Sequence, residues 1–119
     1  MAIKDYKDLI VWQKSMDLVV EIYRLIKKLP KEEIYGISDQ MRRSAVSIPS
    51  NIAEGYNRVS VKEYVRFLYM IKGSRAELET QIFICIRLGY LTESDCEIAL
   101  NLLTEISKML TSIIQKITY

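Results

Sequence analysis

A stripe of small polar residues along the second predicted helix is the part of the sequence best suited to binding chemistry. Its members are Ser44, Ser47, Asn51 and Glu54. They are spaced by three, four and three residues, so they share one side of the helix. Pro49 lies among them and removes one backbone hydrogen bond. The serines, Asn51 and Pro49 cost stability in a helix interior, so something must compensate for them. We call Ser44, Ser47, Pro49, Asn51 and Glu54 the polar stripe.

The sequence leaves two interpretations of the polar stripe open. In the first, the small side chains let this helix approach the next one closely at Gly73 and Ser74. The hydroxyls and the amide then satisfy one another and the carbonyl of Ala45, which Pro49 leaves without its helical donor. In the second, the stripe and Glu77 line a polar groove that receives a ligand or a nucleic-acid backbone.

Basic residues gather in two groups, although the net charge of the chain is only +2. The first group closes the first predicted helix: Arg24, Lys27, Lys28 and Lys31. The second group surrounds the second helix and the start of the third, with three tyrosines nearby: Arg42, Arg43, Arg58, Lys62 and Arg66. Because arginine and lysine contact phosphates and tyrosine stacks on unpaired bases, the second group is the predicted nucleic-acid-binding surface. A solvated charged face is the alternative.

Nothing in the sequence indicates catalysis. The chain has no histidine, which excludes histidine metal sites and Ser–His–Asp triads. Glu54, Glu77 and Glu79 are suited to ion pairs with arginines of neighbouring helices, and no nucleophile or metal-ligand spacing accompanies them. The four glycines are dispersed, so no phosphate-cradling loop is present. We therefore expect no catalytic residue, no metal, no cofactor and no enzymatic activity.

Length and composition suit a single domain over residues 1–119, since half of the residues are hydrophobic. The start of the chain, MAIKDYKD, does not resemble a signal peptide, and no stretch of about 18 apolar residues is free of charge. We therefore expect a cytoplasmic protein that does not cross a membrane. Cys85 and Cys96 are expected to be free, buried thiols, with a disulfide between them as the alternative.

Helical periodicity without strand-like alternation predicts four helices. They span about residues 8–29, 38–55, 60–89 and 92–117. Ser38, Ser60 and Thr92 are the predicted N-caps, and Gly55 and Gly89 are the predicted C-caps. The start at Ser60 is the clearest, because a glutamate follows at capping-box spacing.

Each predicted helix carries an apolar seam with spacings of three and four residues. In the first helix the seam is Leu9, Trp12, Met16, Val19, Tyr23 and Ile26. In the second and third helices it is Met41, Ala45, Ile48 and Ile52, then Tyr64, Leu68, Ile71, Leu78, Ile82 and Cys85. In the fourth helix it is Cys96, Ala99, Leu103, Ile106, Leu110, Ile113 and Ile117. Short breaks between helices of comparable length predict an all-α fold, an antiparallel up-down-up-down four-helix bundle.

The first and fourth helices carry further apolar residues outside these seams. This surplus predicts that one or both helices pack against another subunit of a homo-oligomer. A wide core face within one subunit is the alternative.

Five segments resemble one protein family and extend over almost the whole chain, from about Leu9 to Ile117. They are VWQKSMDL (11–18), PKEEIYG (30–36), QMRRSAVSIPSNIAEGYNR (40–58), FLYMIKGSRAELE (67–79) and RLGYL (87–91). The resemblance is to the four-helix bundle protein family, also called the 23S rRNA intervening-sequence protein family. Its most specific part is SIPSNIAEG at 47–55. Ser44, and Ile71-Lys72 before the Gly-Ser pair, depart from the family pattern without affecting the expected fold.

The resemblance implies properties that the residues alone do not. Family members assemble as ring-like homopentamers, and some are encoded inside intervening sequences of large-subunit ribosomal RNA genes. A related branch consists of accessory proteins of diversity-generating retroelements, which bind a reverse transcriptase and nucleic acid. No enzymatic activity is established for the family.

Two functional hypotheses follow. The first is a non-enzymatic accessory protein that associates with RNA or DNA as a homo-oligomer, mainly through phosphate contacts and with little base readout. The alternative is a protein-interaction scaffold without nucleic-acid binding, whose partner, such as a reverse transcriptase, is held by apolar contact. Binding in the first case weakens steeply with salt, and binding in the second tolerates salt.

Overall fold

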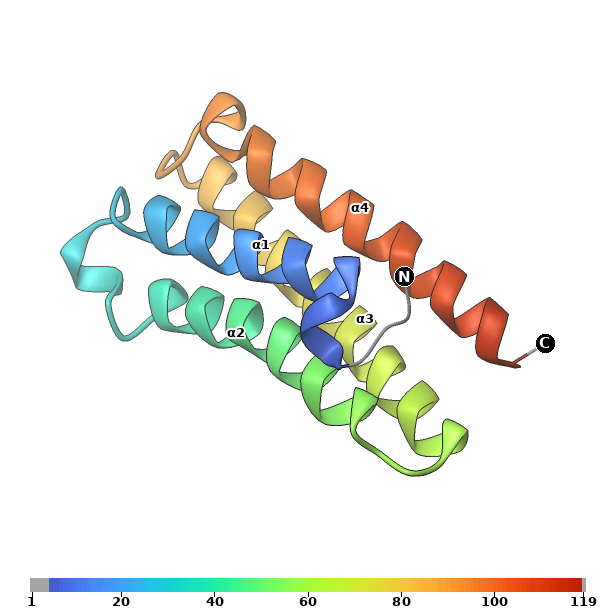
Figure 1. Ribbon diagram of the computed structural model, residues 1–119. Coiled ribbons are helices and arrows are strands. Elements are labelled where there is room, and N and C mark those ends of the chain that lie inside the picture. The colour runs from blue at the N-terminus through green and yellow to red at the C-terminus, as the bar shows by residue number, and fades with distance from the viewer. Residues whose placement is uncertain (1–4, 119) are drawn as a thin grey trace.

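The computed structural model describes residues 5–118, which form four long helices packed side by side (Figure 1). The helices are α1 Ile10–Ile26, α2 Ile37–Tyr56, α3 Val61–Arg87 and α4 Glu93–Thr118. Short 3-10 turns precede α1 and α2, over Tyr6–Asp8 and Lys31–Glu33. Successive helices pack together, and α1 against α4 closes the bundle. No strand occurs within residues 5–118, so the predicted all-α antiparallel bundle is confirmed.

Two predicted helix starts are present with the expected capping bonds. The Ser60 hydroxyl accepts a hydrogen bond from the Glu63 N–H at 3.1 Å. At α4, the Thr92 N–H donates to the Asp95 carboxylate at 2.9 Å, and the Asp95 N–H donates to the Thr92 hydroxyl at 3.0 Å. The Thr92 N–H, together with the ammonium of Lys28, lowers the pKa of Asp95 to about 2. The Lys28–Asp95 ion pair, at 2.9 Å, also ties the start of α4 to the end of α1.

The end of α3 at Gly89 is confirmed as well. Gly89 has a φ of 78°, which glycine adopts without a steric penalty. Its N–H donates to the Ile86 carbonyl at 3.0 Å, and the Tyr90 N–H donates to the Cys85 carbonyl at 2.9 Å. This is the Schellman arrangement, which satisfies two terminal carbonyls of the helix.

The predicted caps at Ser38 and Gly55 are wrong. The α2 helix begins one residue earlier, at Ile37, and Ser38 is only 3% exposed inside its first turn. The helix also continues one residue past Gly55. Gly55 serves packing rather than helix termination, because a Cβ there would lie 2.6 Å from the Cβ of Phe67 on α3. Of the two glycines in α2 and α3, Gly55 is the one in close contact with the other helix.

The buried seam of α1 differs from the predicted one. The buried apolar side chains of α1 are Val11, Leu18, Ile22 and Leu25. Met16 and Tyr23, which belong to the predicted seam, are 41% and 45% exposed. Apolar residues cover so much of the circumference of α1 that two seams of the same spacing compete, and contacts with α2 and α4 select between them.

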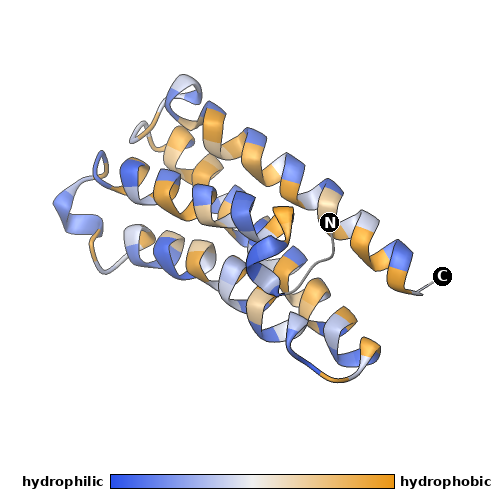
Figure 2. Ribbon diagram, in the orientation of Figure 1, coloured by the Kyte–Doolittle hydropathy of each residue, from blue (hydrophilic) through white to orange (hydrophobic). Residues whose placement is uncertain are grey.

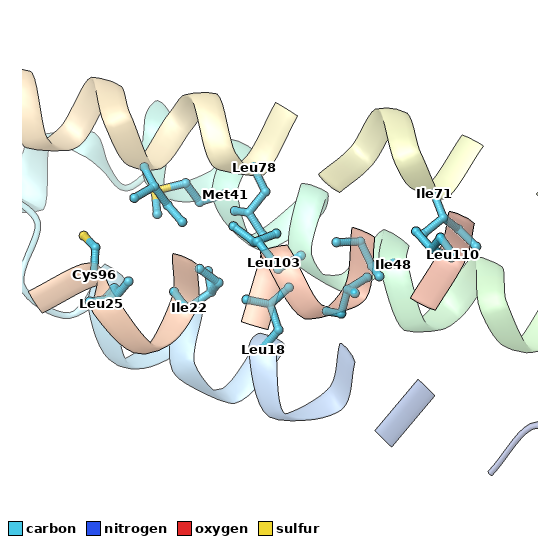
Figure 3. Close-up of a cluster of buried hydrophobic side chains, with 14 of the residues drawn as sticks. Leu18, Ile22, Leu25, Met41, Ile48, Ile71, Leu78, Cys96, Leu103 and Leu110 are labelled. Carbon is cyan, nitrogen blue, oxygen red and sulfur yellow. The ribbon is translucent and has the colours of Figure 1, made fainter. Parts of the chain in front are cut away.

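The predicted seams of the other three helices form the core. Figure 3 shows Met41 and Ile48 of α2, Leu78 of α3 and Leu103 of α4 converging with the buried residues of α1. Apolar segments recur along all four helices, with polar residues between them (Figure 2). Within residues 5–118, no helix combines the length and the apolar character that crossing a bilayer requires.

Both cysteines are free and buried, as expected. The Cys85 thiol lies 3.7 Å from the sulfur of Met41. Burial is the main reason that the pKa of Cys85 rises to about 11. Cys96 is also raised in pKa, again mainly by burial. Neither thiol therefore carries a thiolate at neutral pH.

The apolar surplus of α4 is used within its own bundle, where Leu100, Leu102 and Met109 pack against the core. Large apolar side chains are exposed mainly on the other long helices. On α1 they are Ile10, Met16, Val20 and Tyr23. On α3 they are Val61, Tyr69, Met70, Phe83, Ile84 and, just after the helix, Leu88. The helices α1 and α3, whose backbones do not come close to each other, thus both present apolar faces that are exposed.

Candidate nucleic-acid interface

The end of α1 and the start of α2 bring basic side chains of both helices to one surface, which we call the basic end. Its members are Arg24, Lys27, Lys31, Arg42 and Arg43. A groove of about 480 Å³ between the helices has Arg42 and Arg43 on its α2 side and Tyr23 on its α1 side. Tyr23 also borders a neighbouring groove with Arg24 and Lys27. The basic side chains therefore form one continuous surface around a half-exposed tyrosine.

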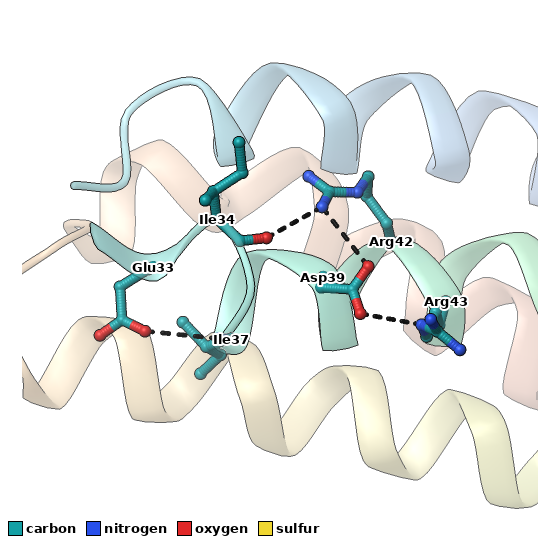
Figure 4. A network of polar contacts seen from close by, with 6 residues as sticks. All are labelled: Glu33, Ile34, Ile37, Asp39, Arg42 and Arg43. Atoms are coloured by element: carbon teal, nitrogen blue, oxygen red, sulfur yellow. Dashed lines mark hydrogen bonds and ion pairs between the residues drawn. The ribbon is translucent and has the colours of Figure 1, made fainter. Parts of the chain in front are cut away.

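Asp39 orients the two arginines of α2 (Figure 4). Its carboxylate accepts from Arg43 Nε at 2.9 Å and from Arg42 Nη2 at 3.5 Å. The same Nη2 donates to the carbonyl of Ile34 at 3.1 Å, which ties α2 to the segment after α1. The Arg43 side chain is still 80% exposed, so its remaining donors are available to an incoming anion.

Glu33 fixes the same connecting segment from the other side. One carboxylate oxygen accepts from the Ile37 N–H at 3.4 Å (Figure 4), and the other accepts from the Tyr90 hydroxyl at 2.9 Å. The hydrogen bond to Glu33 is the main cause that raises the pKa of Tyr90. The basic end is therefore built on a connection that is anchored to α2 and to the turn between α3 and α4.

The other predicted nucleic-acid-binding residues lie elsewhere, at the end of α2 and the start of α3. We call this group the far corner: Arg58, Lys62 and Arg66. Arg58 pairs with Glu54 at 2.7 Å, and the guanidinium carbons of Arg58 and Arg66 lie 5.0 and 6.0 Å from the ring centre of Phe67. Arg43 lies on α2, whereas Arg58 lies beyond its last residue, Tyr56. The stretch of helix from Arg43 to Tyr56 alone spans roughly 20 Å at 1.5 Å per residue. The predicted set is thus divided between two surfaces.

The polar stripe keeps its hydrogen bonds within α2. The Ser47 hydroxyl donates to the Ser44 carbonyl at 2.8 Å, and the Asn51 amide donates to the Ser47 carbonyl, also at 2.8 Å. Pro49 is buried inside the continuous helix. These bonds do not reach the carbonyl of Ala45, so the predicted mutual satisfaction of the stripe is replaced by bonds to nearby carbonyls of the same helix.

The predicted close approach at Gly73 and Ser74 is wrong. Gly73 is exposed, and a Cβ added to it would meet no atom within 4 Å. Gly73 and Glu77 instead line a groove of about 410 Å³ between α2 and α3. Ser47 lies in the groove between α1 and α2. The stripe residue Ser47 and the predicted partner Glu77 therefore face different grooves.

The carboxylates pair with arginines close in sequence rather than across the bundle. Glu54 of α2 binds Arg58, which lies just after the helix, and Glu79 binds Arg75 within α3 at 3.3 Å. Both pairs have a spacing of four residues. In the part of the chain that the structure describes, no three potential metal-ligating side chains come together. What the basic end offers chemically is attraction for anions, with an aromatic ring beside it.

The joining of the two basic groups was not foreseen from the sequence. The predicted set contains Arg42 and Arg43 but not Lys27 or Lys31, because these lysines belong to the other predicted group. Tyr23 belongs to the predicted core seam of the first helix. The sequence feature that predicts this joining is the short connection after Pro30, because it requires the end of the first helix to lie beside the start of the second.

Comparison with known proteins gives a family match and a structural match. The family described as 23S rRNA-intervening sequence protein matches residues 7–112. The structure is similar, with a TM-score of 0.81, to the crystal structure of a protein of unknown function from the S23 ribosomal protein family of Bacteroides thetaiotaomicron. The two chains are 33% identical over 88% of this chain and 98% of that chain. No curated protein matches this chain.

Proposed function

Because the chain belongs to the 23S rRNA-intervening sequence protein family, we propose that it is a non-enzymatic accessory protein that associates with nucleic acid. RNA is the expected nucleic acid, and the active form is a homo-oligomer. The observation that carries this proposal is the basic end, where cations of α1 and α2 line adjoining grooves around Tyr23. No catalytic residue, metal or cofactor has a part in it.

Phosphate contacts supply most of the affinity in this proposal. Arg43 is largely exposed, so it can keep the contact of its Nε with Asp39 while its other nitrogens reach a phosphate. Lys27 forms no ion pair within residues 5–118. Each contact releases counterions, and the logarithm of the binding constant falls with the logarithm of salt by about 0.7 per phosphate of a single strand. In an oligomer the same surface repeats around the symmetry axis, so one RNA meets several copies.

Neutralising the basic end is expected to lower the affinity for RNA and to make that affinity less sensitive to salt. In the variant Lys27→Gln/Arg42→Gln/Arg43→Gln, the slope of log affinity against log salt should become shallower by about 2 per engaged surface, since about 0.7 is lost per contact. Glutamine keeps a donor for the carbonyl of Ile34. Fluorescence anisotropy of a labelled structured RNA at several salt concentrations measures both quantities.

The matched comparison is Arg58→Gln/Lys62→Gln/Arg66→Gln, which removes the same charge from the far corner. Because that surface lies at the opposite end of α2, we expect a smaller change. A loss of binding in this variant alone would move the interface to the far corner. Unchanged binding in both variants would reject the proposed contact with nucleic acid, provided that circular dichroism shows both to be folded.

The proposed oligomer, a pentamer by family resemblance, uses the apolar faces of α1 and α3. The two faces differ in their residues and lie on helices whose backbones do not come close to each other. A face of one kind packed against a face of the other is a heterologous contact, which closes into a ring when the rotation permits. A second copy of the chain is therefore the occupant that we propose for these faces.

Replacing Ile84 and Leu88 by aspartate is expected to break this assembly, because both are exposed on the α3 side and burying a charge there is costly. Light scattering should give about five times the chain mass of 13.9 kDa for the native protein and close to one chain mass for the variant. Ile98→Asp on α4, where the replaced residue is 56% exposed, is the matched control and should leave the mass unchanged. A native protein that stays monomeric at high concentration would contradict the proposal.

The second candidate function is a scaffold that binds a protein partner. The exposed apolar faces favour it, because they are as suited to a protein helix as to another copy. Binding of this kind is insensitive to salt, so the salt series described above distinguishes the two functions.

A further inference from the structure

A small pocket lies beneath the basic end, where the end of α1 meets the start of α2. Its volume is about 210 Å³, below the range of about 300–1,000 Å³ that holds a drug-sized ligand. Its polar lining comes from Lys27, Lys31, Ser38 and Arg42, and the rest is apolar side chain of α1 and the connection after it. The pocket therefore suits one compact charged group rather than a whole nucleotide.

Ser38 carries the strongest indication of a ligand. The residue is only 3% exposed, and its hydroxyl forms no hydrogen bond within residues 5–118. Its Oγ is nevertheless not fully enclosed, because Gln81 Oε1 is the only fully buried side-chain nitrogen or oxygen without a partner within the described residues. Ser38 is among the residues that line the pocket, so its hydroxyl can donate a hydrogen bond to an acceptor bound there.

The charges around the pocket require that group to be an anion. Lys27 and Lys31 form no ion pair within the described part of the chain, and Arg42 engages only its Nη2 atom. Asp39 is paired with Arg43 at 2.9 Å and with Arg42 Nη2 at 3.5 Å. Glu32 and Glu33 are the carboxylates of the connection, and Glu33 accepts from the Ile37 N–H and the Tyr90 hydroxyl. None of these three carboxylates is among the residues that line the pocket.

The backbone adds to the same preference. The pocket lies at the N-terminus of α2, a helix of 20 residues, which is the positive end of its dipole. The N-cap of α2, Gly36, supplies no side-chain acceptor to the first turn. Glu33 accepts from the Ile37 N–H at 3.4 Å, and no other side-chain acceptor caps this first turn within the described residues. A helix start flanked by three cations and a hydroxyl is an arrangement that can bind phosphate.

We propose that this pocket binds a single phosphoryl group, held by Lys27, Lys31, Arg42 and the Ser38 hydroxyl. A terminal phosphate of a nucleic-acid strand and free inorganic phosphate share this chemistry. Recognition of a terminal phosphate would make the proposed nucleic-acid function more specific, and it rests on that function. Binding of inorganic phosphate does not depend on it. A strand whose end is seated here continues onto the grooves of the basic end that lie directly beside the pocket.

The test begins with inorganic phosphate, titrated into the native protein and followed by calorimetry. Ser38→Ala is expected to lower the affinity about tenfold, because it removes one hydrogen bond to a charged group. It should not lower the melting temperature, since it removes a hydroxyl that is unpaired in the free protein. Lys27→Gln/Lys31→Gln should lower the affinity at least as much, and Lys108→Gln, an exposed lysine of α4, should have no effect. No saturable binding, or binding that Ser38→Ala leaves unchanged, would overturn the proposal.

A second arm distinguishes the two sources of the phosphoryl group. The same single-stranded RNA is compared with a 5′-phosphate, a 3′-phosphate and hydroxyls at both ends. Tighter binding of a phosphorylated form, lost in Ser38→Ala, identifies a strand end as the ligand. Equal binding of all three, with saturable inorganic phosphate, identifies free phosphate and leaves the pocket assignment intact. Binding of the unphosphorylated RNA tests only the proposed nucleic-acid function. The phosphate pocket and the nucleic-acid function can therefore each fail without the other.

Discussion

Replacing Leu18 by alanine is expected to lower the free energy of unfolding by about 2–5 kcal/mol, whereas Met16→Ala should cost less than about 1 kcal/mol. Leu18 is fully buried among the four helices, and Met16 is 41% exposed on the same helix. The first substitution leaves a cavity, and the second removes a side chain that is still partly hydrated. Urea unfolding followed by circular dichroism at 222 nm measures both costs.

The comparison tests the register of α1 directly. If the predicted seam were the buried one, the two costs would be exchanged, because Met16 belongs to that seam and Leu18 does not. Unfolding at several protein concentrations separates any contribution from association, which depends on concentration, from the stability of the bundle itself. Equal costs for both variants would contradict the observed packing of α1.

Alanine is expected to have opposite effects at two helical glycines. Gly55→Ala places a Cβ 2.6 Å from the Cβ of Phe67, and two atoms fixed to their backbones cannot avoid each other by rotation. Gly73→Ala meets no atom within 4 Å and should stabilise the helix by about 0.5–1 kcal/mol. Because the gain in helix propensity is common to both, the difference between the variants isolates the overpacking at Gly55, which we expect to be about 1–3 kcal/mol.

The difference is measured by the same urea unfolding, with Gly55→Ala as the less stable protein. Equal stabilities, or a more stable Gly55→Ala, would show that α2 and α3 are not in close contact at Phe67. The experiment also decides between the observed packing and the close approach at Gly73 and Ser74 that the sequence favoured.

The features of the fold that depend on neighbouring residues could be predicted from the sequence. Ser60, Gly89 and Thr92 act on backbone groups within a few positions, so their chemistry is visible in a short window. Ser38 and Gly55 look equally suited to ending a helix, yet the structure uses both inside α2. Their roles are set by what lies opposite them, which no local pattern contains.

The same distinction explains the candidate site. Arg43 and Arg58 are 15 residues apart and most of α2 separates them, since Arg58 lies just after the helix. Lys27 and Arg42 are also 15 residues apart, yet they line the same pocket, because the connection between α1 and α2 folds back. Charge and residue type are read from a sequence, whereas the surface on which they meet is a property of the packed helices.

The most direct test of the central claim is the salt dependence of RNA binding by the native protein. The account predicts saturable binding at low salt and a slope of log affinity against log salt of about −2 or steeper, corresponding to at least three phosphates. That result would support contact between the basic end and the nucleic-acid backbone. The absence of binding at low salt, or a slope near zero, would contradict it and favour the protein-interaction scaffold.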